Sequence, residues 1–296
     1  MDMATAKRSA PKPAGSPRPA CFKLPRDFLD NRFVYLTISP RARGLSVGLD
    51  FNPDGFCNFD CVYCEVNRVA GMRDRKLDVA VMSEELERTL HMVSAGELCE
   101  RPQYRSLPEE LLTLRHVALS GDGEPTLCPE FAAAVEAVIR VRARGRFPFF
   151  KLVLITNASG LDRPEVTEGL RLFHAQDEVW AKLDAGTEPY FQRINKSQCK
   201  LEQVLANILA LARQRPVIIQ SLFPVVHECG PTPDEVDAYV LRLLDLKGAG
   251  AQIPLVQIYS ATRPMMRPEC GHLRLNILSA IAQRVRTETG LKAEVF

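Results

Sequence analysis

Three cysteines lie close together in this chain with no fourth cysteine near them, and this limits the kind of centre they can form. Cys57, Cys61 and Cys64 fall in the run FNPDGFCNFDCVYC, and the next cysteine along the chain is Cys99. The three can supply thiolate ligands to a metal centre, but they leave a four-ligand site incomplete. Turn-forming residues surround them after the β-like run 45–51, so the sequence predicts a loop at the end of a strand.

The spacing C-x3-C-x2-C, with the aromatic Tyr63 before the last cysteine, resembles the cluster-binding loop of the radical SAM superfamily. The resemblance implies a [4Fe-4S] cluster held by the three cysteines, with its fourth iron chelated by the amino and carboxylate groups of S-adenosyl-L-methionine (SAM). From the residues alone, two other interpretations stay open. The cysteines could bind zinc with a remote fourth ligand, or they could be buried as small apolar side chains.

The overall composition is that of a globular enzyme with little net charge. The chain has 296 residues, of which 46% are hydrophobic and 25% charged, and its formal net charge is +2. This balance gives no field strong enough to indicate a nucleic-acid or membrane partner. An odd number of cysteines, nine, fits a reducing compartment, and no apolar stretch approaches membrane-spanning length. We therefore expect a cytoplasmic protein with no membrane partner.

The chain is expected to divide into a short tail and one domain. Residues 1–22 are rich in proline, alanine, serine and basic residues, and Asp2 is their single acid. Such a segment buries too little apolar surface to order itself, so it predicts a disordered basic tail. Residues 23–296 are expected to form a single catalytic domain.

Short apolar β-like runs alternate with amphipathic helical patterns, a rhythm typical of parallel β/α units. The expected strands are 45–51, 116–119, 151–155, 178–183, 217–222 and 253–258. The expected helices are 83–94, a short piece ending near 114, 129–142, 164–173, 189–194, 201–213, 233–248 and 275–289. Right-handed crossovers between parallel strands give an open sheet or a barrel, and the resemblance implies a partial (β/α)6 barrel of the radical SAM type. An extra run, 33–38, is expected to extend or cover a sheet edge.

Three residues mark the start of the helix 233–248. Thr232 can accept a backbone hydrogen bond as the cap, Pro233 suits the first turn, and Glu235 completes a capping box. In such a box the Glu235 carboxylate reaches back to the N–H of Thr232.

Polar or glycine-rich residues follow every predicted strand, at the ends where parallel α/β proteins place their active sites. In the run SGDGEPTLCPEF, Gly121 and Gly123 let the backbone approach a ligand closely, and Glu124 can pair with an ammonium group. This run resembles the GGE motif of the superfamily. The resemblance assigns Glu124, with the neighbouring backbone, to the amino group of SAM. A plain turn with a capping carboxylate is the alternative from the residues alone.

The later strand ends carry further candidates for binding the cofactor or substrate. Thr156 and Asn157 suit a ribose or carboxylate, or form an ordinary turn. In the segment WAKLDAG, Lys182 and Asp184 share one strand face. They are either a structural ion pair or a functional one, with Asp184 near the ribose and Lys182, a candidate catalytic residue, near the cofactor carboxylate or substrate. The remaining cofactor-binding candidates are Tyr63, Gln220, Ser221, Gln257 and Tyr259.

Two short cysteine-histidine pairs follow neighbouring predicted strands. His227-x-Cys229 and Cys270-x-His272 are candidates for a second metal site, or are incidental loop residues.

Two groups of arginines suggest binding of anions. The stretch 140–146 carries four arginines, a pattern that suggests RNA binding, but it ends a helix at the opposite end of the barrel from the cysteines. Favourable placement near a helix C-terminus explains it at least as well. Arg263 and Arg267, after the last expected barrel strand, are better placed to meet an anionic substrate, or lie in a solvated loop.

The landmarks from Leu45 to the C-terminus together resemble a bacterial group of uncharacterised radical SAM iron-sulfur oxidoreductases, related to the wyosine-base tRNA synthases. Those synthases also need further N-terminal cysteines, whereas only Cys21 precedes the motif here. The resemblance implies an enzyme in which reduction of the cluster cleaves SAM to a 5'-deoxyadenosyl radical, which abstracts hydrogen from an unidentified substrate. It also implies a one-electron donor such as flavodoxin or ferredoxin.

Other functions stay open from the sequence. A small-molecule or nucleotide substrate is preferred because no RNA-binding domain is evident, while a nucleic-acid substrate is not excluded. The alternatives are a radical SAM tRNA-modifying enzyme of the wyosine kind and a non-catalytic iron-sulfur protein that transfers electrons.

Overall fold

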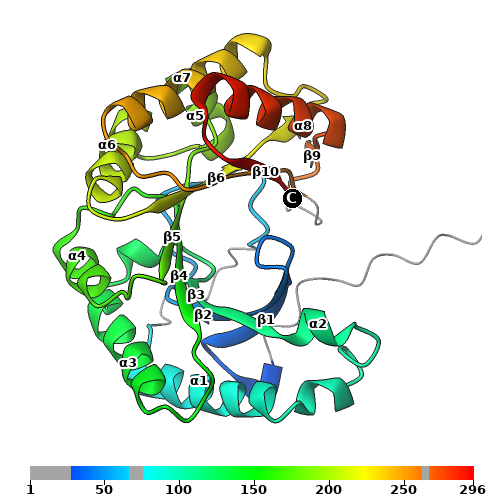
Figure 1. Ribbon diagram of the computed structural model, residues 1–296, viewed down its shortest axis with the longest axis vertical. Helices are drawn as coiled ribbons and strands as arrows, with labels where there is room; N and C mark the ends of the chain where they lie inside the picture. The colour runs from blue at the N-terminus through cyan, green and yellow to red at the C-terminus, as the bar shows by residue number, and fades with distance from the viewer. Residues whose placement is uncertain (1–27, 67–75, 262–266) are drawn as a thin grey trace, which may run out of the picture.

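Eight strands form one curved sheet whose order follows the chain. The computed structural model describes residues 28–66, 76–261 and 267–296, and its main sheet has the order β1-β2-β3-β4-β5-β6-β8-β10. β1 pairs antiparallel with β2, and the other neighbouring strands are parallel. The strands are β1 (Val34–Ser39), β2 (Gly44–Asp50), β3 (Leu114–Ser120), β4 (Lys151–Thr156), β5 (Glu178–Lys182), β6 (Val217–Leu222), β8 (Val256–Tyr259) and β10 (Ala293–Val295). The sheet curls into a half-ring that is open beside its two edge strands (Figure 1).

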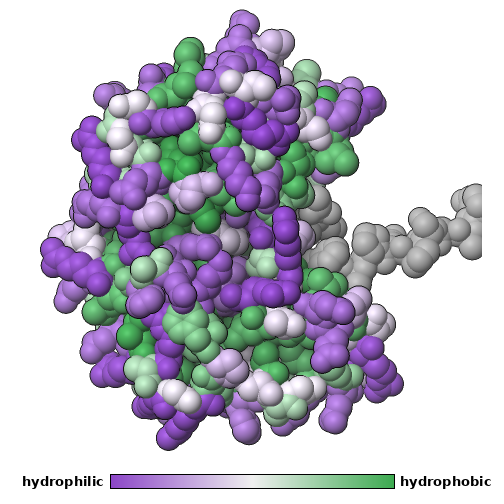
Figure 2. Space-filling view, in the orientation of Figure 1, coloured by the Kyte–Doolittle hydropathy of each residue, from purple (hydrophilic) through white to green (hydrophobic). Residues whose placement is uncertain are grey.

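The helices cover the outer, convex side of this sheet (Figure 1). They are α1 (Val79–Ser94), α2 (Glu109–Leu112), α3 (Phe131–Ala143), α4 (Pro164–Arg171), α5 (Glu188–Asn195), α6 (Leu201–Ala212), α7 (Pro233–Gly248) and α8 (Leu275–Arg284), which continues as a π-helical turn, Val285–Thr289. Each longer helix buries one apolar side; in α1 this side includes Met82, Leu86 and Leu90, which are four residues apart. Hydrophilic side chains occupy much of the outer rim seen in Figure 2, as expected for such helices.

The predicted partial barrel of parallel strands is confirmed, with differences at some element ends. α1 begins at Val79 rather than at 83, because the Asp78 side chain accepts hydrogen bonds from the N–H groups of Ala80 and Val81. The strand expected at 253–258 is shorter and shifted, as β8. β10 and a separate two-stranded ribbon of β7 (Pro224–Val226) and β9 (Cys270–His272) were not predicted, because three-residue strands show too little alternation.

The predicted capping box of α7 is only half correct. Thr232 accepts a hydrogen bond from the N–H of Glu235 at 3.2 Å, as expected. The Glu235 carboxylate does not reach back to Thr232 but instead binds the loop after β5, accepting from the N–H of Gly186 and the hydroxyl of Thr187, both at 2.5 Å. Gly186 approaches so closely that a Cβ there would lie 2.1 Å from the Tyr239 nitrogen, so the loop comes within reach of this carboxylate.

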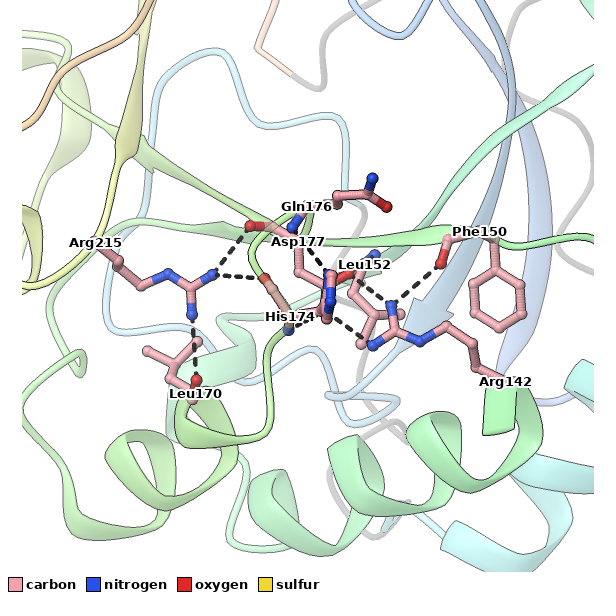
Figure 3. Close-up of polar contacts among 8 residues, drawn as sticks. All are labelled: Arg142, Phe150, Leu152, Leu170, His174, Gln176, Asp177 and Arg215. Atoms are coloured by element: carbon pink, nitrogen blue, oxygen red, sulfur yellow. Dashed lines mark hydrogen bonds and ion pairs between the residues drawn. The ribbon is translucent and has the colours of Figure 1, made fainter. Parts of the chain in front are cut away.

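A buried ion-pair network ties helices to the sheet at the end opposite the cysteine loop (Figure 3). Asp177, just before β5, accepts from both terminal nitrogens of Arg142, at 2.7 and 3.0 Å. It also accepts from the N–H groups of Leu152 and His174, each at 2.7 Å. Arg215 donates to the carbonyl oxygens of Asp177 and His174 at 3.0 and 3.5 Å. These bonds join α3, β4, β5 and the start of β6 at one point.

The arginine-rich stretch is used mainly within the fold. Besides Arg142, Arg144 and Arg146 both pair with the Glu87 carboxylate of α1, and Arg140 pairs with Glu136 one turn earlier. These pairs explain the basic cluster better than an RNA-binding surface does.

Two of the expected features fall outside the described residues: the basic tail 1–22, with Cys21, and Arg263. Among the helices that are described, none has the length and hydropathy needed to cross a bilayer.

Candidate cofactor site

The cysteine loop lies directly after β2, at the rim where the parallel strands end. Cys57, Cys61 and Cys64 are each half-buried, and none is in a disulfide. The Cys57 sulfur accepts hydrogen bonds from the backbone N–H of Phe59 at 3.4 Å and, more weakly, from the side-chain amide of Asn157 at 3.8 Å. The Cys61 sulfur accepts from the Asn195 amide at 3.5 Å. Donors directed at sulfur stabilise thiolates, so two of the three cysteines already have partners suited to ligands.

The cysteine loop rests against the glycine-rich loop that follows β3. The N–H of Glu124 donates to the carbonyl oxygen of Phe56 at 3.0 Å, and a Cβ on Gly123 would lie 1.9 Å from that oxygen. Gly121 has φ +133°, and a Cβ there would lie 2.0 Å from the Asp50 carboxylate. The two glycines therefore make room for the protein's own chain, which packs the two loops together. Whether they also meet a ligand stays a prediction.

Glu124 is hydrogen-bonded to the end of the next strand, β4. Its carboxylate is buried and accepts from the Thr126 N–H and hydroxyl, from the Thr156 hydroxyl at 2.5 Å and from the Asn157 N–H at 2.7 Å. Burial raises the pKa of Glu124, although these donors partly oppose the shift. The Asn157 amide in turn donates to the Asn58 side chain at 2.9 Å, within the cysteine loop. Thr156 and Asn157 thus connect Glu124 to the cysteines, which the sequence did not suggest.

Asp184 is the centre of a second network on the other side of the loop. Its Oδ2 accepts from the Tyr63 hydroxyl, in a short bond, and from the Asn195 amide at 2.8 Å. Its Oδ1 accepts from the Leu222 N–H at 2.8 Å and lies 3.4 Å from Lys182 Nζ. Asp184 therefore links the cysteine loop to the ends of β5 and β6. The predicted Lys182–Asp184 pair exists.

Lys182 points to the concave side of the sheet between two aromatic rings. Nζ lies 4.8 Å from the centre of the Tyr63 ring and 5.4 Å from that of Tyr259, and it donates to the Tyr259 hydroxyl at 3.1 Å. Burial alone would lower the pKa of Lys182, but Asp184 and Tyr259 outweigh it, so the pKa is raised. The amine is therefore a stable cation, suited to holding an anionic group.

Gln220 and Gln257 lie beside Lys182, whereas Ser221 does not. Lys182, Gln220 and Gln257 are paired across β5, β6 and β8, and Gln220 donates to Gln257 at 2.8 Å. The expectation that Ser221 reaches the same place is wrong, because neighbouring strand residues face opposite sides. Its hydroxyl instead lies 2.6 Å from that of Tyr239 on α7.

An apolar layer closes the concave side below these polar residues. Val153, Trp180 and Ile218, from three adjacent strands, form a buried cluster separate from the main core. Beneath it, Glu178 accepts from the Trp180 ring N–H at 2.8 Å and pairs with Lys151 at 2.5 Å. This layer excludes water from one end of the candidate site, which strengthens the interactions of charges above it.

The donor set fits a cubane better than a single metal ion. Across residues 28–66, 76–261 and 267–296, no three His, Cys, Asp or Glu side chains converge as one ion would require. Each cysteine of a cubane binds a different iron, so the three can stand apart. The same finding argues against the second metal site at His227, Cys229, Cys270 and His272. Burial and the nearby Asp184 raise the pKa of Cys61 to about 11, so ligand binding there must release a proton.

Comparison with known families identifies the group to which the chain belongs. Residues 51–246, two thirds of the sequence, match the family described as the radical SAM superfamily. The chain belongs to the radical SAM superfamily. Membership confirms the resemblance seen in the cysteine spacing, and it implies a [4Fe-4S] cluster and SAM as cofactors.

Curated relatives carry no assigned function in their names. The chain is 28% identical over 179 residues to the UPF0026 protein slr1464 of Synechocystis, covering 59% of this chain and 57% of that protein. It is 25% identical over 175 residues to the UPF0026 protein MJ1312 of Methanocaldococcus jannaschii, covering 58% and 47%. The chain thus spans about half the length of the curated relatives it matches.

Three solved structures share the fold of this chain at low sequence identity. TYW1 with a lysine-pyruvate adduct has a TM-score of 0.57 at 15% identity, covering 88% of this chain and 85% of that one. Streptococcus suis SuiB, bound to its precursor peptide SuiA, has a TM-score of 0.54 at 13% identity, covering 84% and 48%. A spore photoproduct lyase mutant has a TM-score of 0.56 at 10% identity, covering 90% and 79%. These likenesses support the half-barrel fold alone.

Sequence reasoning missed several residues that shape the site. Asn195, at the end of α5, contacts Cys61, Tyr63 and Asp184, but an asparagine near a helix end gives no such signal. Asp50, the last residue of β2, accepts from the N–H of Asn52 before the cysteines and from the N–H of Asp122 in the glycine-rich loop. Its position at a strand end could have marked it. Arg267, expected to meet a substrate, pairs with Asp60 of the cysteine loop at 2.5 Å.

Proposed function

We propose that this chain is an enzyme that holds a [4Fe-4S] cluster through Cys57, Cys61 and Cys64 and cleaves SAM reductively. One observation carries the proposal: three half-buried thiols lie in one loop at the strand-end rim of a half-barrel, and the sulfurs of Cys57 and Cys61 accept N–H donors. When bound, the cofactors supply a 5'-deoxyadenosyl radical that removes hydrogen from a substrate. A one-electron donor such as flavodoxin or ferredoxin would reduce the protein.

The chain's own residues support this chemistry by positioning and by excluding water. Asn157 and Asn195 hold Cys57 and Cys61 through N–H donors, which favours the thiolate form needed for binding iron. Tyr63 and Asp184 fix the loop against β5 and β6. A reactive radical needs a site closed to solvent, and the apolar layer around Trp180 closes one end of it.

The contacts with SAM follow from the strand ends. The Glu124 carboxylate already accepts four hydrogen bonds, close to its full capacity, so we assign the amino group of SAM mainly to the backbone of the loop that Glu124 orients. Lys182 is the cation for the cofactor carboxylate or the substrate, and Asp184 is the candidate ribose partner. Gln257 and Tyr259 are the candidate partners of adenine or substrate.

Loss of any one cysteine of the loop tests the proposal. We expect Cys57→Ala, Cys61→Ala and Cys64→Ala each to lose the cluster and to reduce 5'-deoxyadenosine formation to background, because two thiolates do not retain a catalytic cubane. The measurement is iron content per chain after anaerobic reconstitution, together with dithionite-dependent 5'-deoxyadenosine formation.

The matched control is Cys99→Ala, an exposed cysteine outside the loop, which should retain both iron and activity. Retained activity in any of the three loop variants would refute the assignment. A wild-type protein that holds iron but leaves SAM intact would instead be an electron-transfer protein.

A further inference from the structure

Arg41 is a half-buried cation that forms no ion pair with the residues that the structure describes. It lies in the turn between β1 and β2, and its guanidinium carbon lies 4.3 Å from the centre of the Tyr259 ring. Its Nε is buried and has no hydrogen-bond partner. Among the described residues, no carboxylate forms an ion pair with it. Buried N–H groups are normally hydrogen-bonded, so the Nε–H of Arg41 lacks an expected acceptor.

The turn between β1 and β2 is held by contacts of Arg43, two residues after Arg41. The Arg43 side chain is 75% exposed and pairs with Glu294 of β10 at 3.3 Å, across the open side of the half-ring. Its carbonyl oxygen accepts from Arg115 at 3.1 Å. The turn is therefore anchored by other contacts, and Arg41 extends inward from an already fixed support.

A second unpaired nitrogen belongs to His116, which is paired with Lys151 near the start of β3. It is only 1% exposed on β3, its Nδ1 has no hydrogen-bond partner, and its ring lies edge-on to Trp180 with centroids 5.4 Å apart. Burial, followed by the charges of Lys151 and Arg41, lowers the pKa of His116 to about 3. The ring is therefore neutral, and His116 belongs to the layer around Trp180 rather than to the surroundings of Tyr259.

Lys182 adds a second cation beside Tyr259, on the side nearer the cysteine loop. It has Asp184 as its counter-ion at 3.4 Å, whereas Arg41 has none. Two cations therefore lie beside the Tyr259 ring, and the one carboxylate, Asp184, pairs with Lys182 alone, which leaves an excess of positive charge. From the cysteine loop the order of contacts is Tyr63, Lys182, Tyr259 and Arg41, so Arg41 is the member most distant along this series.

We propose that Arg41, held beside Tyr259, forms a subsite for an oxyanion of the substrate, a carboxylate or phosphate group. A guanidinium offers its donors in a planar fork that matches two oxygens of such a group. The subsite adds to the proposed function one chemical feature of the substrate, an anionic group. Binding of the anion does not depend on the proposed function, but any reaction of the bound substrate does.

Titration calorimetry with simple anions tests the subsite. The protein is reconstituted with its cluster, saturated with SAM and titrated anaerobically with inorganic phosphate and, separately, with acetate. We expect one of the two to bind, and the better one identifies the class of oxyanion. Arg41→Gln should weaken that binding at least about tenfold, since a lost charge-assisted hydrogen bond has an effect of this size. Arg43→Gln, the matched control in the same turn, should change it by less than about twofold.

A second variant separates binding from folding. Arg41→Lys keeps the charge but not the fork, so its affinity should fall between those of wild type and Arg41→Gln. Both variants should keep the near-UV circular dichroism spectrum of the wild type. The proposal is overturned if neither anion binds, if Arg41→Gln and Arg43→Gln behave alike, or if SAM and the anion compete, which would assign Arg41 to the cofactor.

Failure of the anion subsite can be distinguished from failure of the proposed function. A protein that cleaves SAM but ignores both anions refutes the subsite alone. A protein that binds an anion through Arg41 but leaves SAM intact refutes the proposed function and retains the subsite.

Discussion

At the scale of single residues, the site depends on a few buried polar side chains that each serve two neighbours. Asp184 accepts from Tyr63 in the cysteine loop and from the backbone of Leu222 at the end of β6. Asn195 donates to Cys61 and to Asp184. Because each is satisfied by groups from distant parts of the sequence, their positions are determined by the fold as a whole and resist local change.

His116 should make the stability of the protein depend on pH. Its pKa is about 3 when folded and about 6.5 when unfolded, so below pH 6.5 the unfolded chain binds a proton that the folded protein does not. Stability contributed by this residue is therefore complete above pH 6.5 and is lost as pH falls toward 3. Between pH 7 and pH 5 the loss should be about 2 kcal/mol.

The measurement for His116 is the free energy of urea unfolding of the cluster-free protein at pH 7 and pH 5. His116→Gln keeps a polar side chain but does not titrate, so its stability should change less between the two values than that of the wild type. Equal changes in the two proteins would show that another group is responsible.

At the scale of elements, the strand ends form the cofactor site, and the starts of β4, β5 and β6 carry the supporting Asp177 network. The cysteine loop, the glycine-rich loop and the Lys182 region all follow strands, whereas the Asp177 network lies where strands begin (Figure 3). Residues in one region can thus be changed with little effect on the other.

Asp177→Asn tests this separation. The substitution leaves Arg142 with no buried counter-charge, and we expect a loss of about 3 kcal/mol in the free energy of unfolding. Glu136→Gln, which removes the exposed pair with Arg140, should cost about 0.5 kcal/mol or less. Urea unfolding measures both. Folded Asp177→Asn protein should still form 5'-deoxyadenosine at the wild-type rate, and a large loss of that rate would contradict the separation.

The elements themselves could be predicted from sequence wherever a pattern is local. The strands 151–155 and 217–222 and the helix 201–213 agree with β4, β6 and α6 to within one residue, because apolar periodicity is a property of the segment itself. The side-chain partners could not be predicted. Glu235 binds the loop after β5 rather than its own cap, and Ser221 faces α7, because these choices depend on which elements pack together.

At the scale of the whole molecule, the curved sheet carries both the candidate cofactor site and the proposed anion subsite. The strand-end rim carries the cysteines, and the open side, crossed by the pair of Arg43 and Glu294, brings Arg41 to Tyr259. The cysteine spacing predicted the cofactor site from sequence. The contact between Arg41 and Tyr259 could not be predicted without the curled sheet. The two residues are more than two hundred residues apart in the chain and belong to opposite ends of the strand order.

The most direct test of the central claim, an iron of the cluster left open for SAM, is electron paramagnetic resonance of the reconstituted, dithionite-reduced protein with and without SAM. We expect about four irons per chain and a reduced-cluster signal whose shape changes when SAM is added, because the cofactor would bind the iron without a cysteine. A protein that holds zinc instead, or a cluster whose signal is the same with and without SAM, would contradict the account.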